Sequence, residues 1–336
     1  MLRERAPGLQ ARDRGGGAVT AASGSALRIG TRGSALALAQ ATPVAEKLGA
    51  ELVVIQSGGD RDRSTPLADF GGTGVFVTAL REALLAGEVD ALIHSYKDLP
   101  TAPADGLEIA AVPRRADARD ALAARDGLTL EHLPQGARIG TGSPRRRAQL
   151  LARRADLDVV GLRGNIDTRL GRVGGADAGI DPERRLDAIV LAAAGLDRLG
   201  RSAEATELFP LDPWPTAPAQ GALAVEARTG AVPRALRSVD HQPSRLTAEA
   251  ERAVLARLEA GCAAPLGVHA LLDDGLLFVS ARVYALDGSA HLTSSHAMYA
   301  ADVRDPAGEL AARVAGELLD QGAAELAPLG PGGAAS

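Results

Sequence analysis

The sequence predicts an α/β protein in which two related lobes precede a small α+β module. Two segments, Leu27–Gly30 and Arg138–Gly140, each have the pattern of a short strand that leads into a capped helix. Two apolar runs, 89–93 and 186–191, lack alternation, which is typical of buried strands in a parallel sheet. After Thr247 the pattern changes to one helix, two strands and a final helix. Facing α/β lobes bind ligands at the carboxyl ends of their strands, so we expect a site in the cleft between them.

Serine residues mark the expected helix starts in the two lobes. Ser34 precedes the helical run 35–49, and its hydroxyl can accept a hydrogen bond from a free amide of the first turn. Ser143 has the same place before a second helical run, where Pro144 at the first position loses nothing by its missing N–H. The proline-rich segment 212–218 then predicts a crossover or hinge.

The module after Thr247 and the domain boundaries follow from the same patterns. We expect a helix over 248–259 that ends at Gly261, strands over 276–284 and 291–299 around an Asp287-Gly288 turn, and a last helix that starts at Asp305-Pro306. The expected divisions are a disordered extension (1–25), lobe 1 (26–115 with 216–240), lobe 2 (116–215), a C-terminal α+β domain (241–325) and a disordered tail (326–336).

Composition restricts the class of protein. The chain has 336 residues, of which 46% are hydrophobic and 24% charged, so it can bury an ordinary globular core. A net charge of −5 and an aromatic content of 2% disfavour binding to nucleic acid. No apolar run approaches the roughly 20 residues of a membrane span, so no membrane role is expected. A single cysteine allows no intramolecular disulfide, which fits a cytoplasmic protein.

Two helix starts offer candidate sites for anions. Free amides and a positive dipole end are expected at both, and Arg32 and the run 145–147 add guanidinium groups that can grip carboxylates. A turn after the strand at 158–160 adds Arg163 and Arg169. Either site alone is more simply explained by N-capping and solvated arginines, but two on facing lobes favour a polyanion between them.

Two further features could carry chemistry. Lys97 and Asp98 follow the buried strand of lobe 1, where a carboxylate beside a lysine could stabilise a cation or move protons; a plain surface loop is the alternative. Cys262 lies in a Gly-Cys-Ala-Ala-Pro loop after a helix, where a thiolate could attack an electrophile; a small buried hydrophobe is the alternative. No metal-binding motif is present, so no metal site is expected.

Taken together, these motifs resemble the porphobilinogen deaminase (hydroxymethylbilane synthase) family. The segments IGTRGSALALAQ, HSYKDLPT, GTGSPRRRAQL, LRGNIDTRL and ERAVLARLEAGCAAPLG occur in family order, and the similarity spans Leu27 to about Leu319. The resemblance implies two doubly wound, periplasmic-binding-protein-like lobes plus a small α+β domain. It also implies an enzyme that condenses four porphobilinogen molecules head to tail, with loss of ammonia, on a covalent dipyrromethane cofactor.

The resemblance assigns residues as well. Cys262 matches the cysteine that holds dipyrromethane through a thioether, and Asp98, with Lys97 beside it, matches the catalytic aspartate. Positions that match cofactor-binding residues are Ser95, Lys97, Thr141, Ser143, Arg145, Arg146 and Arg169. Positions that match substrate-binding residues are Arg32, Ser34, Gln40, Arg163, Arg169 and Gln220.

This sequence departs from the family pattern in one loop. Basic residues that are common in the family are replaced by Gly58, Asp69 and Thr73. We hypothesise that Arg61 and Arg63 supply the missing charge.

Two rival functions fit part of the sequence. A two-lobed anion receptor would use the arginine-capped helices but has no use for Cys262 or Asp98, and a thiol-dependent acyl transferase would pair Cys262 with His269. For the synthase, the resemblance implies a cytoplasmic monomer with porphobilinogen as its small-molecule substrate, no nucleic acid or membrane partner, and a transient hand-over of product to uroporphyrinogen-III synthase.

Overall fold

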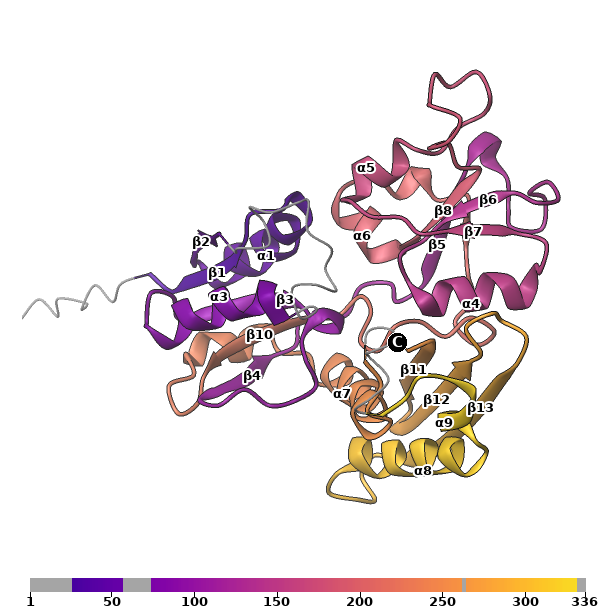
Figure 1. Cartoon of the computed structure of the whole chain (residues 1–336). Helices are drawn as coiled ribbons and strands as arrows, with labels where there is room; N and C mark the ends of the chain where they lie inside the picture. The colour runs from indigo at the N-terminus through magenta and orange to yellow at the C-terminus, as the bar shows by residue number, and fades with distance from the viewer. Residues whose placement is uncertain (1–25, 57–73, 262–263, 331–336) are drawn as a thin grey trace, which may run out of the picture.

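The computed structural model describes residues 26–56, 74–261 and 264–330, which form three sheet-containing units (Figure 1). Two units each contain a five-stranded mixed sheet, and the third contains a three-stranded antiparallel sheet. The predicted α/β class with two lobes and a small third unit is therefore confirmed. Six residues on which the sequence analysis depends lie outside the described residues: Gly58, Arg61, Arg63, Asp69, Thr73 and Cys262.

The first lobe has the strand order β2-β1-β3-β10-β4. Strand β1 pairs in parallel with β2 and β3, whereas β10 pairs antiparallel with β3 and β4. The elements are β1 (Arg28–Arg32), α1 (Ala35–Leu48), β2 (Glu51–Ile55), α3 (Gly74–Leu85), β3 (Ala91–Ser95), the 3-10 turn η1 (Tyr96–Asp98), β4 (Leu107–Ala111), β10 (Leu223–Arg228) and η4 (Arg234–Val239).

The second lobe repeats this arrangement with the order β7-β6-β8-β5-β9. Strand β6 is parallel to β7 and β8, and the antiparallel β5 takes the place that β10 has in the first lobe. The elements are β5 (Asp120–Ala124), η2 (Arg125–Gly127), β6 (Arg138–Gly140), α4 (Pro144–Arg153), β7 (Asp158–Val160), α5 (Ile166–Leu170), β8 (Ala188–Ala192), α6 (Ala193–Arg198), η3 (Ser202–Glu204) and β9 (Glu207–Leu208). The two strand-to-helix starts predicted from the sequence thus belong to two five-stranded sheets with corresponding strand orders.

Both predicted serine caps are present. Ser34 Oγ accepts from the amide of Ala37 at 3.3 Å, and Ser143 Oγ accepts from the amide of Arg146 at 3.4 Å. Each cap satisfies one amide of the first helical turn, which has no partner within the helix. The strands β1 and β6 therefore pass directly into helices whose first turns lie at the carboxyl ends of the sheets.

The C-terminal unit packs helices on one antiparallel sheet. Its elements are α7 (Gln242–Arg257), β11 (Leu266–Asp273), β12 (Leu276–Tyr284), β13 (His291–Tyr299), α8 (Pro306–Asp320) and α9 (Ala323–Leu326). The predicted strands β12 and β13 and the start of α8 are confirmed, but the prediction of two strands missed β11, and the predicted start of α7 was wrong. Helix α7 begins six residues earlier because His241 Nδ1 caps the amide of Ser244 at 3.3 Å and Pro243 fits the first turn. None of the helices in the described ranges has both the length and the apolar character that a membrane span requires.

One buried carboxylate joins three segments of chain where the units meet. Glu251 on α7 is fully buried and accepts hydrogen bonds from both terminal nitrogens of Arg115, at 2.7 and 2.8 Å. It also accepts from the amides of Ala219, at 2.6 Å, and Ala270, at 2.8 Å. Arg115 lies in the crossover from lobe 1 to lobe 2 and Ala219 in the return crossover. Burial alone would raise the pKa of Glu251, but the Arg115 guanidinium lowers it below its usual value.

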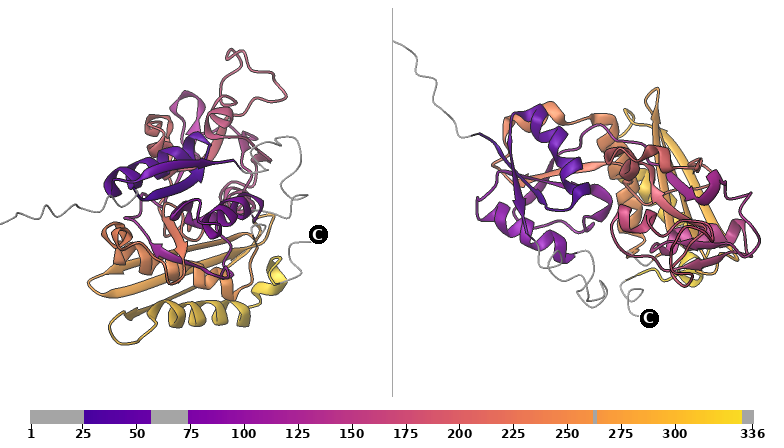
Figure 2. Two further views of the ribbon diagram at one scale, coloured as in Figure 1. Left: turned by 90° about the vertical axis from the view of Figure 1, so that its left-hand side faces the viewer. Right: turned by 90° about the horizontal axis from the view of Figure 1, so that it is seen from above.

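The β12–β13 hairpin of the C-terminal unit docks on helix α4 of the second lobe. Figure 1 shows this hairpin beneath α4, and the view from above in Figure 2 shows lobe 2 lying over the C-terminal unit. Gly288 at the hairpin turn has φ +76°, and a Cβ built there would lie 2.6 Å from both Ala148 O and Ala152 N. Only glycine combines this conformation with so close an approach of two backbones.

We predict that Gly288→Ala destabilises the protein more than Gly275→Ala does. Gly275, in the neighbouring β11–β12 turn, has a similar φ of +78° but has no atom within 4 Å of its built Cβ. Both variants therefore lose about 1–2 kcal/mol of backbone conformational energy, and only Gly288→Ala loses a further ~1–3 kcal/mol from the clash with α4. Urea unfolding followed by circular dichroism measures both, and equal losses would contradict the docking.

We predict that Glu251→Gln lowers the free energy of unfolding by about 3 kcal/mol at pH 7, because it leaves Arg115 buried without its counter-charge. The pKa of Glu251 is lower in the folded protein, so its stabilising contribution is present above the unfolded value and is lost as pH falls through the folded value. The difference between wild type and variant should therefore shrink below about pH 4.5. A difference in urea midpoints that is the same at pH 7 and pH 3.5 would argue against this role.

Candidate active site between the lobes

The centre of the candidate site is the carboxylate of Asp120, at the start of β5. It is fully buried and accepts four hydrogen bonds from side chains. The donors are Arg145 Nη1 at 2.9 Å, Arg146 Nη2 at 2.6 Å, Trp214 Nε1 at 2.9 Å and Gln220 Nε2 at 2.8 Å. Burial on its own would raise the pKa of Asp120, but the two guanidinium groups hold it well below its usual range. Asp120 is therefore held as a carboxylate near neutral pH.

Arg145 and Arg146 face inward from the first turn of α4 and differ in what else they touch. Arg145 Nη1 also donates to Gln149 Oε1 at 2.6 Å and Pro215 O at 3.2 Å, and only 3% of the residue is exposed. Arg146 donates to Val190 O at 3.1 Å, while its Nε is buried and has no acceptor among the described residues. The Nη1 atom of Arg145 is thus bound by protein acceptors, whereas Arg146 keeps its Nε as a donor for another group.

Gln220 connects the two lobes. Its Oε1 accepts from Lys97 Nζ at 3.3 Å and from Arg146 Nη2 at 3.4 Å, while its Nε2 donates to Asp120. Two cations therefore share one amide oxygen, which is fully buried. Burial lowers the pKa of Lys97, and the charge of Arg146 adds to that effect against the opposing charge of Asp98.

Asp98 ends the turn η1, directly after β3, and is exposed. Its neighbour Lys97 is half-buried, so the carboxylate faces outward beside a cation that faces Gln220. At the end of β3, the Ser95 hydroxyl lies 2.9 Å from Nε2 and 3.0 Å from Oε1 of Gln40, which projects from α1. The carboxyl end of this sheet therefore carries a hydroxyl, an ammonium and a carboxylate in sequence.

The remaining predicted residues lie at the two helix starts and in the turn around α5. Thr141 is buried, and its Oγ1 accepts from the amide of Ser143 at 3.2 Å. Arg169 Nε donates to Gly164 O at 2.7 Å, and both burial and the charge of Arg146 lower the pKa of Arg169. Arg32 is half-buried at the end of β1, whereas Arg163 is exposed. The charge of Arg169 thus interacts with that of Arg146, whereas Arg163 is exposed to solvent.

The charges of this cluster are unbalanced. Four cations, Lys97, Arg145, Arg146 and Arg169, lie around two carboxylates, Asp98 and Asp120. A bound group with several carboxylates would relieve the repulsion between Arg146 and Arg169 and would give Arg146 Nε an acceptor. Dipyrromethane, with acetate and propionate groups on each pyrrole, has this character, so the residues present fit it.

Sequence reasoning missed three residues that hold the site together: Asp120, Trp214 and Arg252. Asp120 begins an apolar strand, DALAA, and a carboxylate at such a position indicates a buried ion pair. Trp214 is the single tryptophan, and its fully buried indole donates to Asp120. No local pattern marks Arg252 on α7, because its partners are backbone carbonyls far along the chain.

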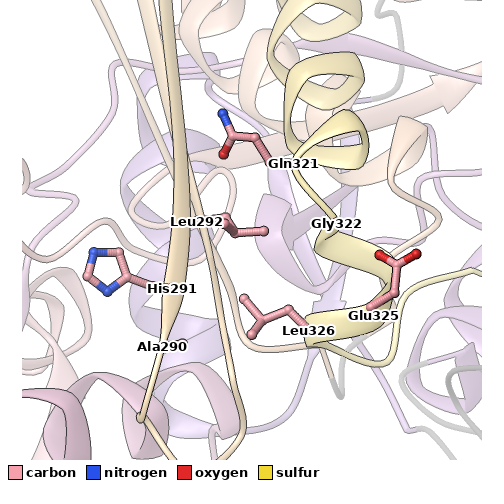
Figure 3. A pocket seen from close by; sticks show the side chains of 7 residues that line it. All are labelled: Ala290, His291, Leu292, Gln321, Gly322, Glu325 and Leu326. Atoms are coloured by element: carbon pink, nitrogen blue, oxygen red, sulfur yellow. The ribbon is translucent and has the colours of Figure 1, made fainter.

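One pocket on the surface does not belong to the site. A surface pocket between β13 and the α8–α9 corner contains no predicted site residue (Figure 3); it is lined by Ala290, His291, Leu292, Gln321, Gly322, Glu325 and Leu326. In the part of the chain that the structure describes, no group of three or more His, Cys, Asp or Glu side chains could hold a metal ion.

Comparison with known proteins agrees with this geometry. The family model for "Porphobilinogen deaminase, dipyromethane cofactor binding domain" matches residues 27–233, and the model for its C-terminal domain matches residues 245–320. Among solved structures, YhfZ from Shigella flexneri has a TM-score of 0.32 at 17% identity, over 68% of this chain and 89% of that one; a similarity this weak supports no conclusion.

Curated relatives match nearly the whole chain. Porphobilinogen deaminase of Leifsonia xyli subsp. xyli is 55% identical over 321 residues, which cover 90% of this chain and 95% of the relative. The porphobilinogen deaminases of Cutibacterium acnes and Thermobifida fusca are 50% and 48% identical and cover 91% and 89% of this chain, with 98% and 95% of their own lengths included. With both family domains and these relatives in agreement, the chain belongs to the porphobilinogen deaminase family.

Proposed function

We propose that this protein is a hydroxymethylbilane synthase, a transferase. It would join four porphobilinogen molecules head to tail with loss of ammonia, extending a dipyrromethane primer held by Cys262, and release the linear tetrapyrrole for porphyrin biosynthesis. The observation that carries the proposal is the chain of contacts from Lys97 through Gln220 to Arg146 and Asp120, because it connects the turn of Asp98 to the arginine-rich start of α4. Membership of the family supports the same activity.

In this proposal Asp98 carries the chemistry. Its carboxylate is exposed, so it can accept hydrogen bonds from pyrrole N–H groups of a bound substrate. When ammonia leaves porphobilinogen, positive charge develops on the ring, and a carboxylate fixed nearby stabilises that charge. Lys97, held by Gln220, adds a second charged group to the same turn.

The cofactor would lie against the cationic cluster. We propose that Lys97, Arg146 and Arg169 pair with its carboxylates, with Ser95, Thr141 and Ser143 as further hydrogen-bonding groups and Arg145 as a buried charge behind them. When bound, dipyrromethane supplies the pyrrole carbon to which the first substrate is joined. Incoming substrate would meet Arg32, Ser34, Gln40, Arg163, Arg169 and Gln220.

The other parts of the assignment are proposals that rest on the family. We propose the domain divisions given above, a cytoplasmic monomer, and transient transfer of the product to uroporphyrinogen-III synthase. A thiol-dependent acyl transferase is less well supported, because His269 Nδ1 faces the buried Glu251 at 3.6 Å. An anion receptor would have no role for the exposed carboxylate of Asp98.

We predict that Asp98→Asn lowers turnover by about 10²–10⁴-fold, because the amide keeps the shape but not the charge that stabilises the developing cation. Thermal stability should hardly change, since the side chain is exposed. Formation of hydroxymethylbilane from porphobilinogen measures the effect. Asp105→Asn, an exposed residue of the same lobe, is the control and should retain full activity. Equal rates for the two variants would rule out the role of Asp98.

We predict that purified protein carries a mass excess equal to two linked pyrrole units on Cys262, and that Cys262→Ser carries none. Intact mass of the denatured protein measures the excess, and peptide mapping locates it. Asp98→Asn should keep the adduct, because removing that charge does not remove the thiol. An unmodified Cys262 in protein from a porphobilinogen-replete cell would refute the assignment of the anchor.

A further inference from the structure

Arg252 of the C-terminal unit reaches across to the turn that carries Asp98. Its Nη1 donates to Tyr96 O and Leu99 O, both at 2.9 Å, and its Nη2 donates to Pro100 O at 2.6 Å. The guanidinium carbon also lies 4.4 Å from the centre of the Tyr96 ring. One side chain on α7 thus contacts the turn just before and just after Lys97 and Asp98.

The Lys97 side chain of this turn is held by Gln220, and the backbone carbonyls at the end of the turn are held by Arg252. The turn is closed by the Leu99 amide on Tyr96 O at 3.3 Å, and the Tyr96 amide donates to Ala222 O at 3.0 Å. These bonds fix where the turn begins. The carbonyls of Leu99 and Pro100, where it ends, accept from Arg252. A planar guanidinium can reach three carbonyls at once, whereas an ammonium on a flexible stem cannot hold that geometry.

Helix α7 gives Arg252 a fixed support. The neighbouring Glu251 is fully buried and binds Arg115 and Ala219 of the two crossovers, together with Ala270 of β11. The end of α7 at Arg257 then leads toward the loop of Cys262. Two consecutive side chains of one helix therefore connect the C-terminal unit to both crossovers and to the Asp98 turn.

We infer that Arg252 is a positioning residue for the reaction: it fixes the orientation of Asp98 relative to the unit that carries the cofactor cysteine. This inference rests on the proposed function of Asp98. A simpler role, in which Arg252 only stabilises the packing of α7 against lobe 1, makes different predictions for kinetics and for the local exposure of the turn.

The first test measures kinetics of the cofactor-loaded, full-length protein. Arg252→Ala should lower kcat by about 10–100-fold through misplacement of the carboxylate, with KM within about threefold of wild type. Arg252→Lys should recover only part of kcat, and Arg257→Ala, which removes an exposed arginine of the same helix, should leave both constants unchanged. Intact mass confirms that each variant still carries its adduct.

A double-variant cycle separates positioning from stability. If Arg252 acts through Asp98, adding Arg252→Ala to Asp98→Asn should cause little further loss of turnover, since the group being positioned is already disabled. Multiplicative losses in the double variant would overturn the inference, as would an Arg252→Ala enzyme that loses thermal stability but keeps kcat.

A second test does not depend on turnover. Lys47 and Lys97 are the two lysines of the sequence, and Lys47 is exposed, so it serves as an internal reference for competitive acetylation. Arg252→Ala should raise the Lys97-to-Lys47 labelling ratio by about threefold or more as the turn loosens, and Arg257→Ala should not. If the wild type made no hydroxymethylbilane but the Lys97-to-Lys47 ratio still rose in Arg252→Ala, the proposed function would be wrong. The inference that Arg252 holds the turn would still be supported. An unchanged ratio in Arg252→Ala would contradict the inference that Arg252 holds this turn, whatever the activity of the enzyme.

Discussion

The buried ionised carboxylate of Asp120 is the constraint on which the site between the lobes depends. A charge removed from water must be compensated, and here four side-chain donors from α4 and the return crossover compensate it. Arg145, Arg146 and Gln220 are oriented by the same anion. If one of them adopted another rotamer, the buried carboxylate would lose a hydrogen bond in a low-dielectric environment, which is costly. The site is therefore preorganised: Arg145 and Arg146 are already oriented by Asp120 before an anionic ligand binds.

The same network explains why positive charge accumulates without neutralising itself. Asp120 accepts from two arginines, but Lys97 and Arg169 stand near Arg146 as additional cations. Their mutual repulsion is a cost of folding that a polycarboxylate ligand removes, so binding and stability are coupled. A growing chain of pyrroles brings carboxylates with every unit, which suits a cluster of this kind.

Much of this architecture could be predicted from local signals. The serine caps and the β12–β13 hairpin depend on neighbours in the sequence, and these predictions are confirmed. The buried strands predicted at 89–93 and 186–191 are present, but they lie at Ala91–Ser95 and Ala188–Ala192 and belong to mixed sheets, not to parallel ones. The start of α7 was missed because a histidine cap is a weak sequence signal. Residues such as Asp120, Glu251 and Arg252 could not be assigned, because their partners are from 19 to 156 positions away and only the fold brings them together. Family resemblance supplied the residues proposed to bind cofactor and substrate, but not Asp120, Trp214 and Arg252, which contact those residues, one another or the Asp98 turn.

The strand order of the two lobes also bears on synthesis of the chain. Lobe 2 builds its sheet from a continuous stretch, β5 to β9, whereas the sheet of lobe 1 needs β10, which follows lobe 2 in the sequence. During synthesis on the ribosome, strands β1 to β4 are made before their antiparallel partner β10. The edges of β3 and β4 that pair with β10 therefore remain unpaired until more than a hundred further residues have been made. The second lobe can fold during that interval, and the first lobe can complete its sheet only after β10 has been made. For the two lobes, the order of completion expected in the nascent protein is thus the reverse of their order in the sequence.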